Sequence, residues 1–517
     1  MNYKKIYDYL PYIVLGLVAF FFNFWISNRG VFPIDTFLHY DSSYKILTGE
    51  KPVKDFWIIH GIALDYIQSV FFYFLGVNWI SYITHSSLFN CIITLIFFKL
   101  LKSLNIKFSY SFVITLCFLT LFYPISGVPF IDHHATFFSL ISLIVFYFGI
   151  INKNNNYFVF IPFLFGLAFF SKPVPSAYLG IIFSVVFFIY FLSEKKLKPF
   201  LYLITGTILF LVLLFIFLNL ENISIKSFVN QLILYPISIG KQRTDFILDA
   251  ISNRLFNYKF IFLLLFYLIF LLIYKNNFSK ISKERLTFLI IIILFSLTMI
   301  IHQILTKNQN FIFFLIPINV SLILYLNNKI NLKNKNIINT FFIIFCILLT
   351  FKYNERFNDK RKFHDLEYIK LDNAINASGI DESLYPLNWI TTTYKNPIDE
   401  FKVIKKLIEE IENSNKNILL ITNYNFIDSI TEKKVFSVVK NFDPVTVPSK
   451  ENKFTENFKM HFTEQLKKKK INEILFFFPA EENIDEVEKN LREYLVSFCY
   501  KYEKVNSTTG RIKINNC

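Results

Sequence analysis

Cysteine is scarce in this sequence, with five residues among 517. So small a number does not suggest a disulfide scaffold. Cys91, Cys117 and Cys346 lie inside apolar runs, where we expect them to be small core residues. Cys499 and Cys517 lie in a polar C-terminal region and could form a disulfide if that region faces an oxidising compartment.

Motifs that bind nucleotides or nucleic acids are also missing. The sequence has no P-loop, no dinucleotide fingerprint and no serine-centred hydrolase elbow. The net charge of +16 at pH 7 collects in short loops between apolar runs, without a basic face or a nucleic-acid motif. No His, Cys or Asp set has strong metal-ligand spacing. We therefore expect no nucleic-acid partner. No metal site or resident cofactor is predicted, and a divalent metal at the adjacent His133 and His134 stays an open alternative.

Long hydrophobic runs dominate the chain instead. Hydrophobic residues make up 54% of it, 66 of them phenylalanine, and the mean hydropathy is +0.43. The sequence predicts a polytopic α-helical membrane protein with about eleven transmembrane helices. These are centred in 10–27, 80–101, 109–124, 134–151, 157–171, 176–193, 200–219, 259–275, 286–304, 311–327 and 337–352. The apolar run 61–77 is short and polar at Asp65 and Gln68, so we interpret it as an interfacial or re-entrant helix.

Charge in the short loops predicts the orientation. Every second loop is rich in lysine and arginine, and the loops between them carry almost none beyond Lys172 and Lys307. Cytoplasmic loops hold the excess of positive charge in membrane proteins. The N-terminus is therefore expected in the cytoplasm, and the loops near residues 30, 124, 171, 221 and 302 outside. An odd number of spans also places the C-terminal region on the outer side.

Composition changes sharply after Lys352. The segments "KNILLITNYNF" and "INEILFFFP" are typical of short buried strands. Three segments before, between and after them show helical spacing: 396–415, 454–470 and 483–498. Strands that alternate with helices indicate a small α/β domain. We therefore predict a transmembrane domain over 1–352 and an outer α/β domain over 353–517.

A polar stretch, His39 to Gly61, follows the first span on the predicted outer face. It contains Asp41 and Asp55, and a carboxylate beside a membrane is functional when it lies in a pocket. An ordinary solvated loop would carry the same residues without a function. Charge alone does not decide between these two interpretations.

The pattern "DSSYKILTGEKPVKDFWIIHGIALDYIQSVFFYFLG" resembles the first outer loop of a family of membrane enzymes. They are the polyprenyl-phosphate-dependent glycosyltransferases of the GT-C superfamily, which include the aminoarabinose transferases of lipid A and the protein O-mannosyltransferases. The residues that match that loop in order are Asp41, Tyr44, Gly49, Asp55 and Gly76. The chain departs from it at Ser42, where an acidic residue is frequent, and at His60–Gly61, where some members have Lys–Pro–Pro.

Three later segments continue the resemblance. "GLAFFSKPVPSAYLG" is similar to the family's "GLAFLTKGP" element, with Lys172 in the matching place. "HQILTKNQNFIFFLIP" resembles a Lys/Arg–aromatic–Pro segment, and Lys307 matches the basic residue. "GVPFIDHHATFFSL" brings polar residues to the outer edge of the fourth span, where the family often has them.

The resemblance implies transfer of a sugar from a polyprenyl-phosphate donor to an outer-face acceptor, with inversion at the anomeric carbon. Asp41 would act as base, and Asp55 would assist at the acceptor site. Lys172 would bind the lipid phosphate, although a lysine that snorkels to the interface fits equally well. The further candidates for binding phosphate or sugar are Tyr44, His60, Asp132, His133, His134, His302 and Lys307.

Two rival functions remain open from the sequence. A polysaccharide polymerase or O-antigen-ligase-type enzyme would depend on an arginine in a large outer loop, and Arg243 lies in the loop 221–258. An interfacial helix anchored by basic residues would explain that loop as well. A lipid-glycan transporter or flippase would place acids at mid-membrane, and the predicted spans are nearly free of Asp and Glu. The sugar, the acceptor and the oligomeric state stay open.

Overall fold

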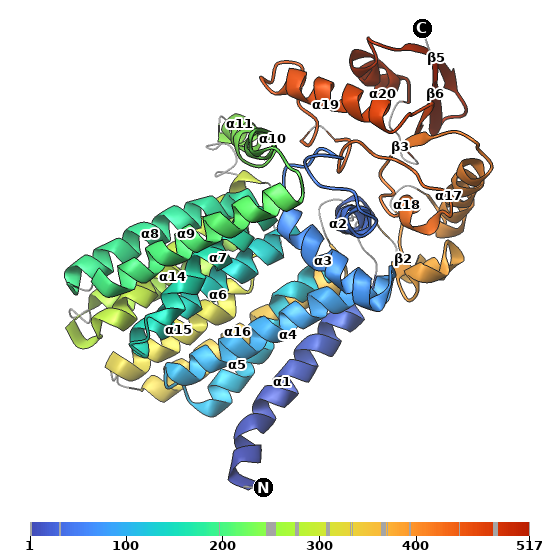
Figure 1. Cartoon of the computed structure of the whole chain (residues 1–517). Coiled ribbons are helices and arrows are strands. Elements are labelled where there is room, and N and C mark those ends of the chain that lie inside the picture. The colour runs from blue at the N-terminus through green and yellow to red at the C-terminus, as the bar shows by residue number, and fades with distance from the viewer. Residues whose placement is uncertain are drawn as a thin grey trace. The chain divides into compact units, whose positions relative to one another are not determined.

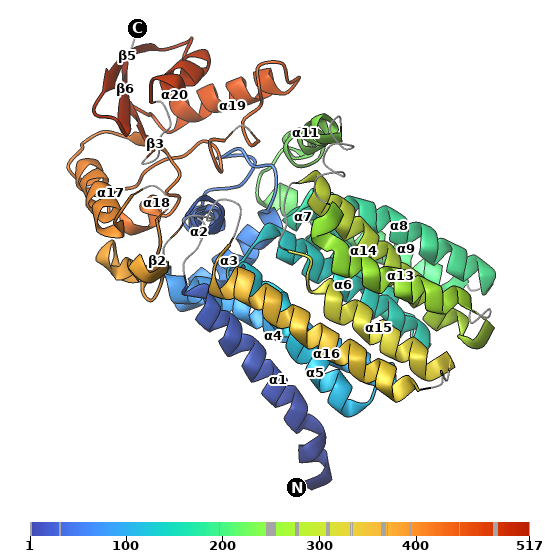
Figure 2. The ribbon, with the colours of Figure 1, turned by 180° about the vertical axis from the view of Figure 1, so that it is seen from behind.

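The computed structural model describes residues 3–29, 33–195, 197–244, 255–274, 279–306, 311–330, 332, 334–362, 369, 371–391, 394–443, 445–478 and 484–515. This part of the chain is mostly helical, and a small mixed sheet lies near the C-terminal end of the sequence (Figures 1 and 2).

Nine helices in the described part are long and apolar enough to cross a membrane. They are α1 (Tyr3–Ser27), α4 (Trp79–Ser103), α5 (Phe108–Leu121), α6 (Ile131–Ile151), α8 (Pro173–Ser193), α9 (Leu197–Leu220), α13 (Lys259–Ile273), α14 (Lys283–Leu305) and α16 (Lys335–Asn354), some of them prolonged by adjoining turns. Their length and composition confirm a multi-pass membrane protein.

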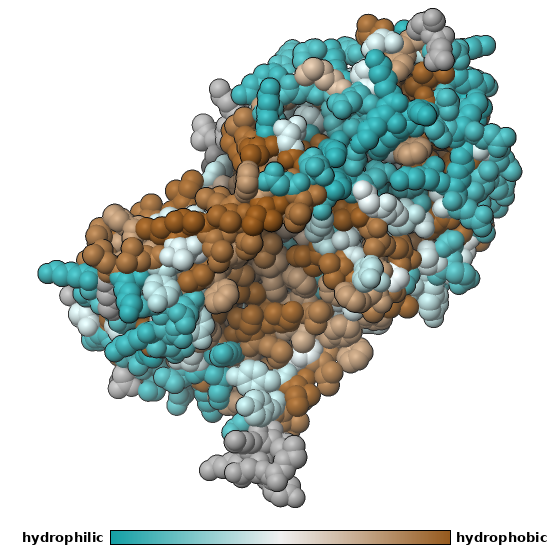
Figure 3. Space-filling view, in the orientation of Figure 1, coloured by the Kyte–Doolittle hydropathy of each residue, from teal (hydrophilic) through white to brown (hydrophobic). Residues whose placement is uncertain are grey.

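The helices differ in how much apolar surface they leave outside. Helix α6 is buried almost all round, with polar and apolar side chains alike inside the bundle. Helix α9 exposes leucine, isoleucine and phenylalanine along most of its length, as its neighbour α8 does. Figure 3 shows this surface as a broad brown area over the helices. Such an apolar area suits contact with lipid chains.

Two further predicted spans are helical but shorter. They are α7 (Asn156–Ser171) and α15 (Leu315–Ile330), each of 16 residues. The count of about eleven spans therefore stays a prediction beyond the nine long helices. The segment expected to be interfacial forms α3 (Ile62–Leu75), of 14 residues, which buries Asp65 and Gln68.

The chain divides into two compact units that are not contiguous in sequence. The first contains Met1–Ser27, Ile83–Ile216 and Gln242–Phe363, and the second contains Asn28–Tyr82, Phe217–Lys241 and His364–Cys517. The second unit thus combines the polar stretch after the first span, part of a later loop and the C-terminal region. The predicted domain boundary after residue 352 stays a prediction.

The second unit contains a four-stranded sheet of order β3–β4–β6–β5. The strands are β3 (Ile418–Thr422), β4 (Glu473–Phe477), β5 (Cys499–Lys504) and β6 (Thr509–Asn515). β3 and β4 are parallel, with Ile418 opposite Glu473, and the other two pairings are antiparallel. The sheet is therefore mixed. Strands β1 (Ile375–Asn376) and β2 (Asn388–Trp389) form a separate antiparallel pair.

Helices join and cover the strands of the sheet. They are α17 (Pro397–Glu412), α18 (Ile427–Ile430), α19 (Thr455–Lys468) and α20 (Ile484–Leu491). Helix α17 begins where the Asn396 side chain accepts a hydrogen bond from the backbone N–H of Ile398, and Pro397 occupies its first turn. It buries Phe401, Ile404 and other apolar residues on one face. Both strands that the sequence predicts for this region are confirmed, as are the helices predicted over 396–415 and 454–470. The helix predicted over 483–498 is shorter, because α20 ends at Leu491.

The N-terminal part of the second unit is tied to this region by backbone hydrogen bonds. It comprises α2 (Pro33–Leu47) and α3, and the later segment contributes α10 (Ile225–Val229) and α11 (Tyr235–Thr244). The backbone N–H of Trp57 donates to the carbonyl of Val438, and the N–H of Lys440 donates to the carbonyl of Trp57. The Gln231 side chain accepts from the N–H of Ile58. Three distant segments of the sequence therefore share one core.

The cysteines follow the expectation from composition. Cys91, Cys117 and Cys346 are free, the latter two buried. Cys499 is disulfide-bonded. Cys517, its expected partner, lies outside the described residues.

Candidate functional site

Asp41 lies on helix α2 in the second unit and is almost completely buried, with 4% of its surface exposed. Lys45 follows one turn later on the same helical face, and its Nζ lies 2.5 Å from Asp41 Oδ2. Lys45 is buried as well. Within the described residues, Asp41 Oδ1 has no hydrogen-bond donor. One carboxylate oxygen is therefore held by a cation while the other stays available.

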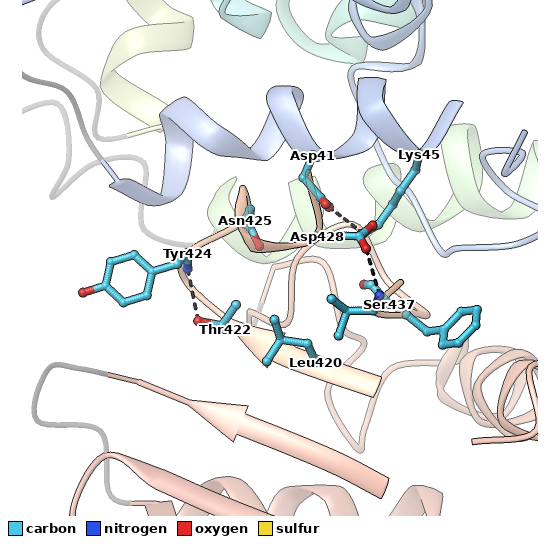
Figure 4. A pocket seen from close by; sticks show the side chains of 10 residues that line it. Asp41, Lys45, Leu420, Thr422, Tyr424, Asn425, Asp428 and Ser437 are labelled. Atoms are coloured by element: carbon cyan, nitrogen blue, oxygen red, sulfur yellow. Dashed lines mark hydrogen bonds and ion pairs between the residues drawn. The ribbon is translucent and has the colours of Figure 1, made fainter. Parts of the chain in front are cut away.

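A second carboxylate, Asp428, lines the same small pocket of about 30 Å³ as this pair. Figure 4 shows Asp41 and Lys45 directed from α2 toward Asp428, which comes from α18 just after β3. The other polar residues that line the pocket are Thr422, Tyr424, Asn425 and Ser437. The position is the carboxyl end of a strand with a parallel neighbour, a place where α/β proteins commonly gather functional groups.

Asp428 is held within the pocket by the backbone. Its Oδ1 accepts a hydrogen bond of 3.0 Å from the N–H of Val435. Burial raises the pKa of Asp428 to about 7, and the neighbouring Asp41 carboxylate adds to this increase. A proton therefore occupies Asp428 about half of the time near neutral pH.

The pKa values of Asp41 and Lys45 are also raised. Burial raises the pKa of Asp41, and Lys45 only partly opposes it. Burial alone would lower the pKa of Lys45, but Asp41, Asp428 and Glu50 outweigh that effect. Two carboxylates thus share one ammonium group in a buried place. Such a site can accept and release a proton near neutral pH.

The other candidates of the polar stretch lie beside this pocket, not among its lining. Tyr44 is half-buried on α2, and burial raises its pKa, with Asp428 and Asp41 adding to the increase. Asp55 accepts a 2.9 Å hydrogen bond from the backbone N–H of Lys51 and lies 2.5 Å from Lys468 Nζ. His60 is half-buried, and its carbonyl lies 3.4 Å from Lys440 Nζ. Asp55 therefore acts here as an ion-pair partner of α19.

A second buried ionic group in the same unit joins α2, α3 and the segment after β3. Asp65 Oδ2 lies 2.5 Å from Lys440 Nζ, and its Oδ1 lies 2.6 Å from His39 Nδ1. All three side chains are at most 2% exposed. Burial lowers the pKa of His39 to about 4, so this imidazole is neutral at pH 7.

The first unit contains a separate polar cluster built from three predicted candidates. Asp132 lies in the first turn of α6, Lys172 at the junction of α7 and α8, and His302 near the end of α14. Asp132 Oδ2 is 2.6 Å from Lys172 Nζ, and Asp132 Oδ1 is 3.2 Å from His302 Nε2. The structure thus brings together residues separated by up to 170 positions. Lys172 already has a carboxylate partner in this cluster.

The two adjacent histidines of α6 point to different partners. His134 Nε2 lies 2.9 Å from Nε2 of His85, a residue that the sequence did not single out. His133 Nδ1 lies 3.3 Å from the hydroxyl of Ser126. Both histidines are buried. No group of three or more metal-ligating side chains occurs among the described residues.

Two predicted candidates cannot be placed. Lys307 lies outside the described residues, and the same holds for the side chain of Arg243, although its backbone belongs to α11.

Asp428, Lys45, His39, Asp65 and Lys440 were not predicted as site residues. Lys45 carried a local signal, because it lies four positions after Asp41 in a segment able to form a helix. Asp428 carried only a weak one, since it follows a predicted buried strand.

No protein-family model and no curated protein matches the chain.

Proposed function

We propose that this chain is an integral-membrane glycosyltransferase that moves a sugar from a polyprenyl-phosphate donor to an acceptor on the outer side of a bacterial inner membrane. The observation that carries the proposal is the buried Asp41 carboxylate, with Lys45 on one oxygen and Asp428 across a pocket. A base near neutral pH and a nearby proton store are what transfer to a hydroxyl acceptor requires.

The proposed chemistry is a single displacement. Asp41 accepts the proton of the acceptor hydroxyl while the acceptor oxygen forms a bond to the anomeric carbon. The bond from that carbon to the phosphate oxygen breaks, and the lipid phosphate leaves with the electron pair. Configuration at the anomeric carbon inverts. Lys45 holds Asp41 in place and favours its charged form.

Several features support a donor carried by lipid. The nine long apolar helices mark a multi-pass membrane protein, and the loop resemblance points to enzymes that use polyprenyl phosphates. Lys172 and His302 meet at Asp132 in the first unit, so phosphate binding by Lys172 would require exchange of one anionic partner for another. A transporter or a polysaccharide polymerase remains the alternative proposal.

The test measures sugar transfer from radiolabelled polyprenyl-phosphate sugars in membranes that contain the protein. We expect Asp41→Asn to lower the transfer rate by about 100-fold or more, because general-base catalysis contributes roughly that factor. Asp399→Asn is the matched control, since it removes an exposed carboxylate of the second unit that does not line the pocket.

Equal transfer by a normally expressed Asp41→Asn variant would overturn the assignment of Asp41. A loss with Asp399→Asn as large as with Asp41→Asn would indicate a general effect of removing a carboxylate from the second unit. A polymerase of the rival type would instead respond to Arg243→Gln and not to Asp41→Asn.

A further inference from the structure

A cationic pocket lies at one end of two neighbouring helices in the first unit. Lys259 is the first residue of α13, while Lys352 and Arg356 lie at the end of α16 and just beyond it. All three side chains are exposed and line a cavity of about 130 Å³. Both helices are candidate spans. The pocket therefore lies at the level where a span reaches lipid headgroups.

The three cations lack anionic partners within the described residues. No carboxylate forms an ion pair with Lys259, Lys352 or Arg356, and the nearby Glu355 is bound to Lys360 instead. Lys259 Nζ and Lys352 Nζ lie 5.4 Å and 4.7 Å from the centre of the same ring, Phe260. Gathering like charges in one place is unfavourable unless an anion lies among them.

Aromatic side chains form a firm wall of the pocket. The rings of Phe313 and Tyr353 stack with centres 3.7 Å apart, and the ring of Phe357 lies nearly parallel to that of Tyr353. Phe313, Tyr353 and Phe357 are all buried. The three cationic side chains therefore lie against a surface of packed aromatic rings.

An apolar groove of about 750 Å³ continues along the same pair of helices. Its walls include Leu263 and Phe266 from α13 and Ile338 and Phe341 from α16, and Tyr267 is the one polar side chain that lines it in the described part. These residues follow the cationic pocket along α13 and precede it along α16. Because the two helices run in opposite directions, pocket and groove succeed one another along one helix pair.

We propose that pocket and groove together bind one phosphate-bearing membrane lipid. The phosphate lies among Lys259, Lys352 and Arg356, and a hydrocarbon chain lies in the groove between α13 and α16. Arginine and lysine are the usual partners of phosphate oxygens, and a basic site next to an apolar groove matches an anionic amphiphile. Free phosphate would use only the pocket. The inference does not depend on sugar transfer.

The experiment measures lipid retention on the purified full-length protein by native mass spectrometry. The probes are phosphatidylglycerol and phosphatidylcholine with identical chains, and inorganic phosphate. We expect the wild-type protein to retain phosphatidylglycerol about tenfold better than phosphatidylcholine. The triple variant Lys259→Gln, Lys352→Gln, Arg356→Gln should lose that tenfold preference, since the cations that attract the anionic headgroup are gone.

Two further variants test two distinctions. One asks whether the position of the positive charge matters, and the other asks whether the hydrocarbon chain contributes beside the headgroup. Lys102→Gln is the matched control, because Lys102 is also an exposed lysine at the end of a span over a phenylalanine ring. It should keep the preference. Ile338→Trp fills the groove, and we expect several-fold weaker retention of both lipids.

Unchanged retention of phosphatidylglycerol by the triple variant would overturn the proposal. So would an equal loss of preference with Lys102→Gln, which would indicate a general effect of net charge. Tight binding of inorganic phosphate without any advantage for phosphatidylglycerol would assign the pocket to a free anion and overturn the lipid. These lipid-binding outcomes can be measured whether or not the protein transfers a sugar.

Discussion

At the residue scale, the candidate site depends on two carboxylates, Asp41 and Asp428. Only the first of them could be predicted from the sequence. Asp41 stands out because it opens a polar stretch after an apolar span and matches a family pattern. Asp428 lies 387 positions away in a region rich in charged residues, where no motif or family pattern distinguishes it. Its significance comes from burial and from the nearby Asp41, which together raise its pKa to about 7.

The raised pKa of Asp428 predicts a pH dependence of stability. In the folded chain the group binds a proton up to about pH 7, while its ordinary pKa is 3.8. The folded state therefore binds more protons between these values, and its free energy of unfolding falls as pH rises through that window. Asp428→Asn removes this loss, which is on the order of 4 kcal/mol.

Thermal unfolding of the full-length protein in detergent, at a series of pH values, measures the effect. The difference in stability between Asp428→Asn and wild type should grow in favour of the variant from about pH 4 to about pH 7 and then level off. A difference that does not change with pH would contradict a raised pKa. Asp41→Asn should shift this window to lower pH, because Asp428 loses the neighbouring negative charge that adds to the increase in its pKa.

At the element scale, the connection between α2 and α3 shows how one glycine holds a buried ionic group in place. Gly61 precedes α3 with φ 87°, a conformation that side-chain-bearing residues rarely adopt. A Cβ atom there would lie 2.6 Å from the His39 ring and 2.8 Å from Lys440 Nζ. Gly49, at the end of α2, has φ 95° but open space around it.

These two glycines make a matched pair for mutation. Gly49→Ala should cost about 1 kcal/mol of unfolding free energy, because only backbone strain is added. Gly61→Ala should cost about 2 to 4 kcal/mol, since it also displaces His39 and Lys440 from Asp65. Denaturant or thermal unfolding of both variants gives the comparison. Equal losses of unfolding free energy would show that His39, Lys440 and Asp65 can shift without further destabilising the fold.

At the scale of the whole molecule, loop charge predicts the orientation in the membrane. The positive-inside pattern depends on all spans together, including the shorter helices α7 and α15, because each omitted span would reverse the loops that follow. The nine long helices establish the class of protein but not the side on which each loop lies.

Labelling with a membrane-impermeant maleimide tests the orientation. Lys153→Cys lies in an exposed loop expected in the cytoplasm, and Asn415→Cys lies in an exposed turn of the C-terminal region expected outside. In intact spheroplasts we expect labelling at position 415 only, and at position 153 after permeabilisation. Labelling of both or neither from outside would contradict an odd number of spans between them and the predicted orientation.

The amino-acid sequence by itself determined the elements whose signal is local. Long apolar runs became long helices, because a membrane-spanning segment must satisfy its backbone hydrogen bonds internally. The short apolar runs at Ile418–Thr422 and Glu473–Phe477 became adjacent parallel strands. Strands β5 and β6 were not predicted, since "CYKYEK" and "TGRIKIN" mix charged and apolar residues on partly exposed faces.

Only the tertiary structure decided which of these pieces share a core and which side chains meet. It placed residues 28–82 and 217–241 in one compact unit with the C-terminal region, and it set Asp428 opposite Asp41. It also gathered Asp132, Lys172 and His302, which the sequence had marked one by one. Contacts between residues hundreds of positions apart leave no periodic trace in the chain, because they arise from packing and shared burial and not from local conformational preference.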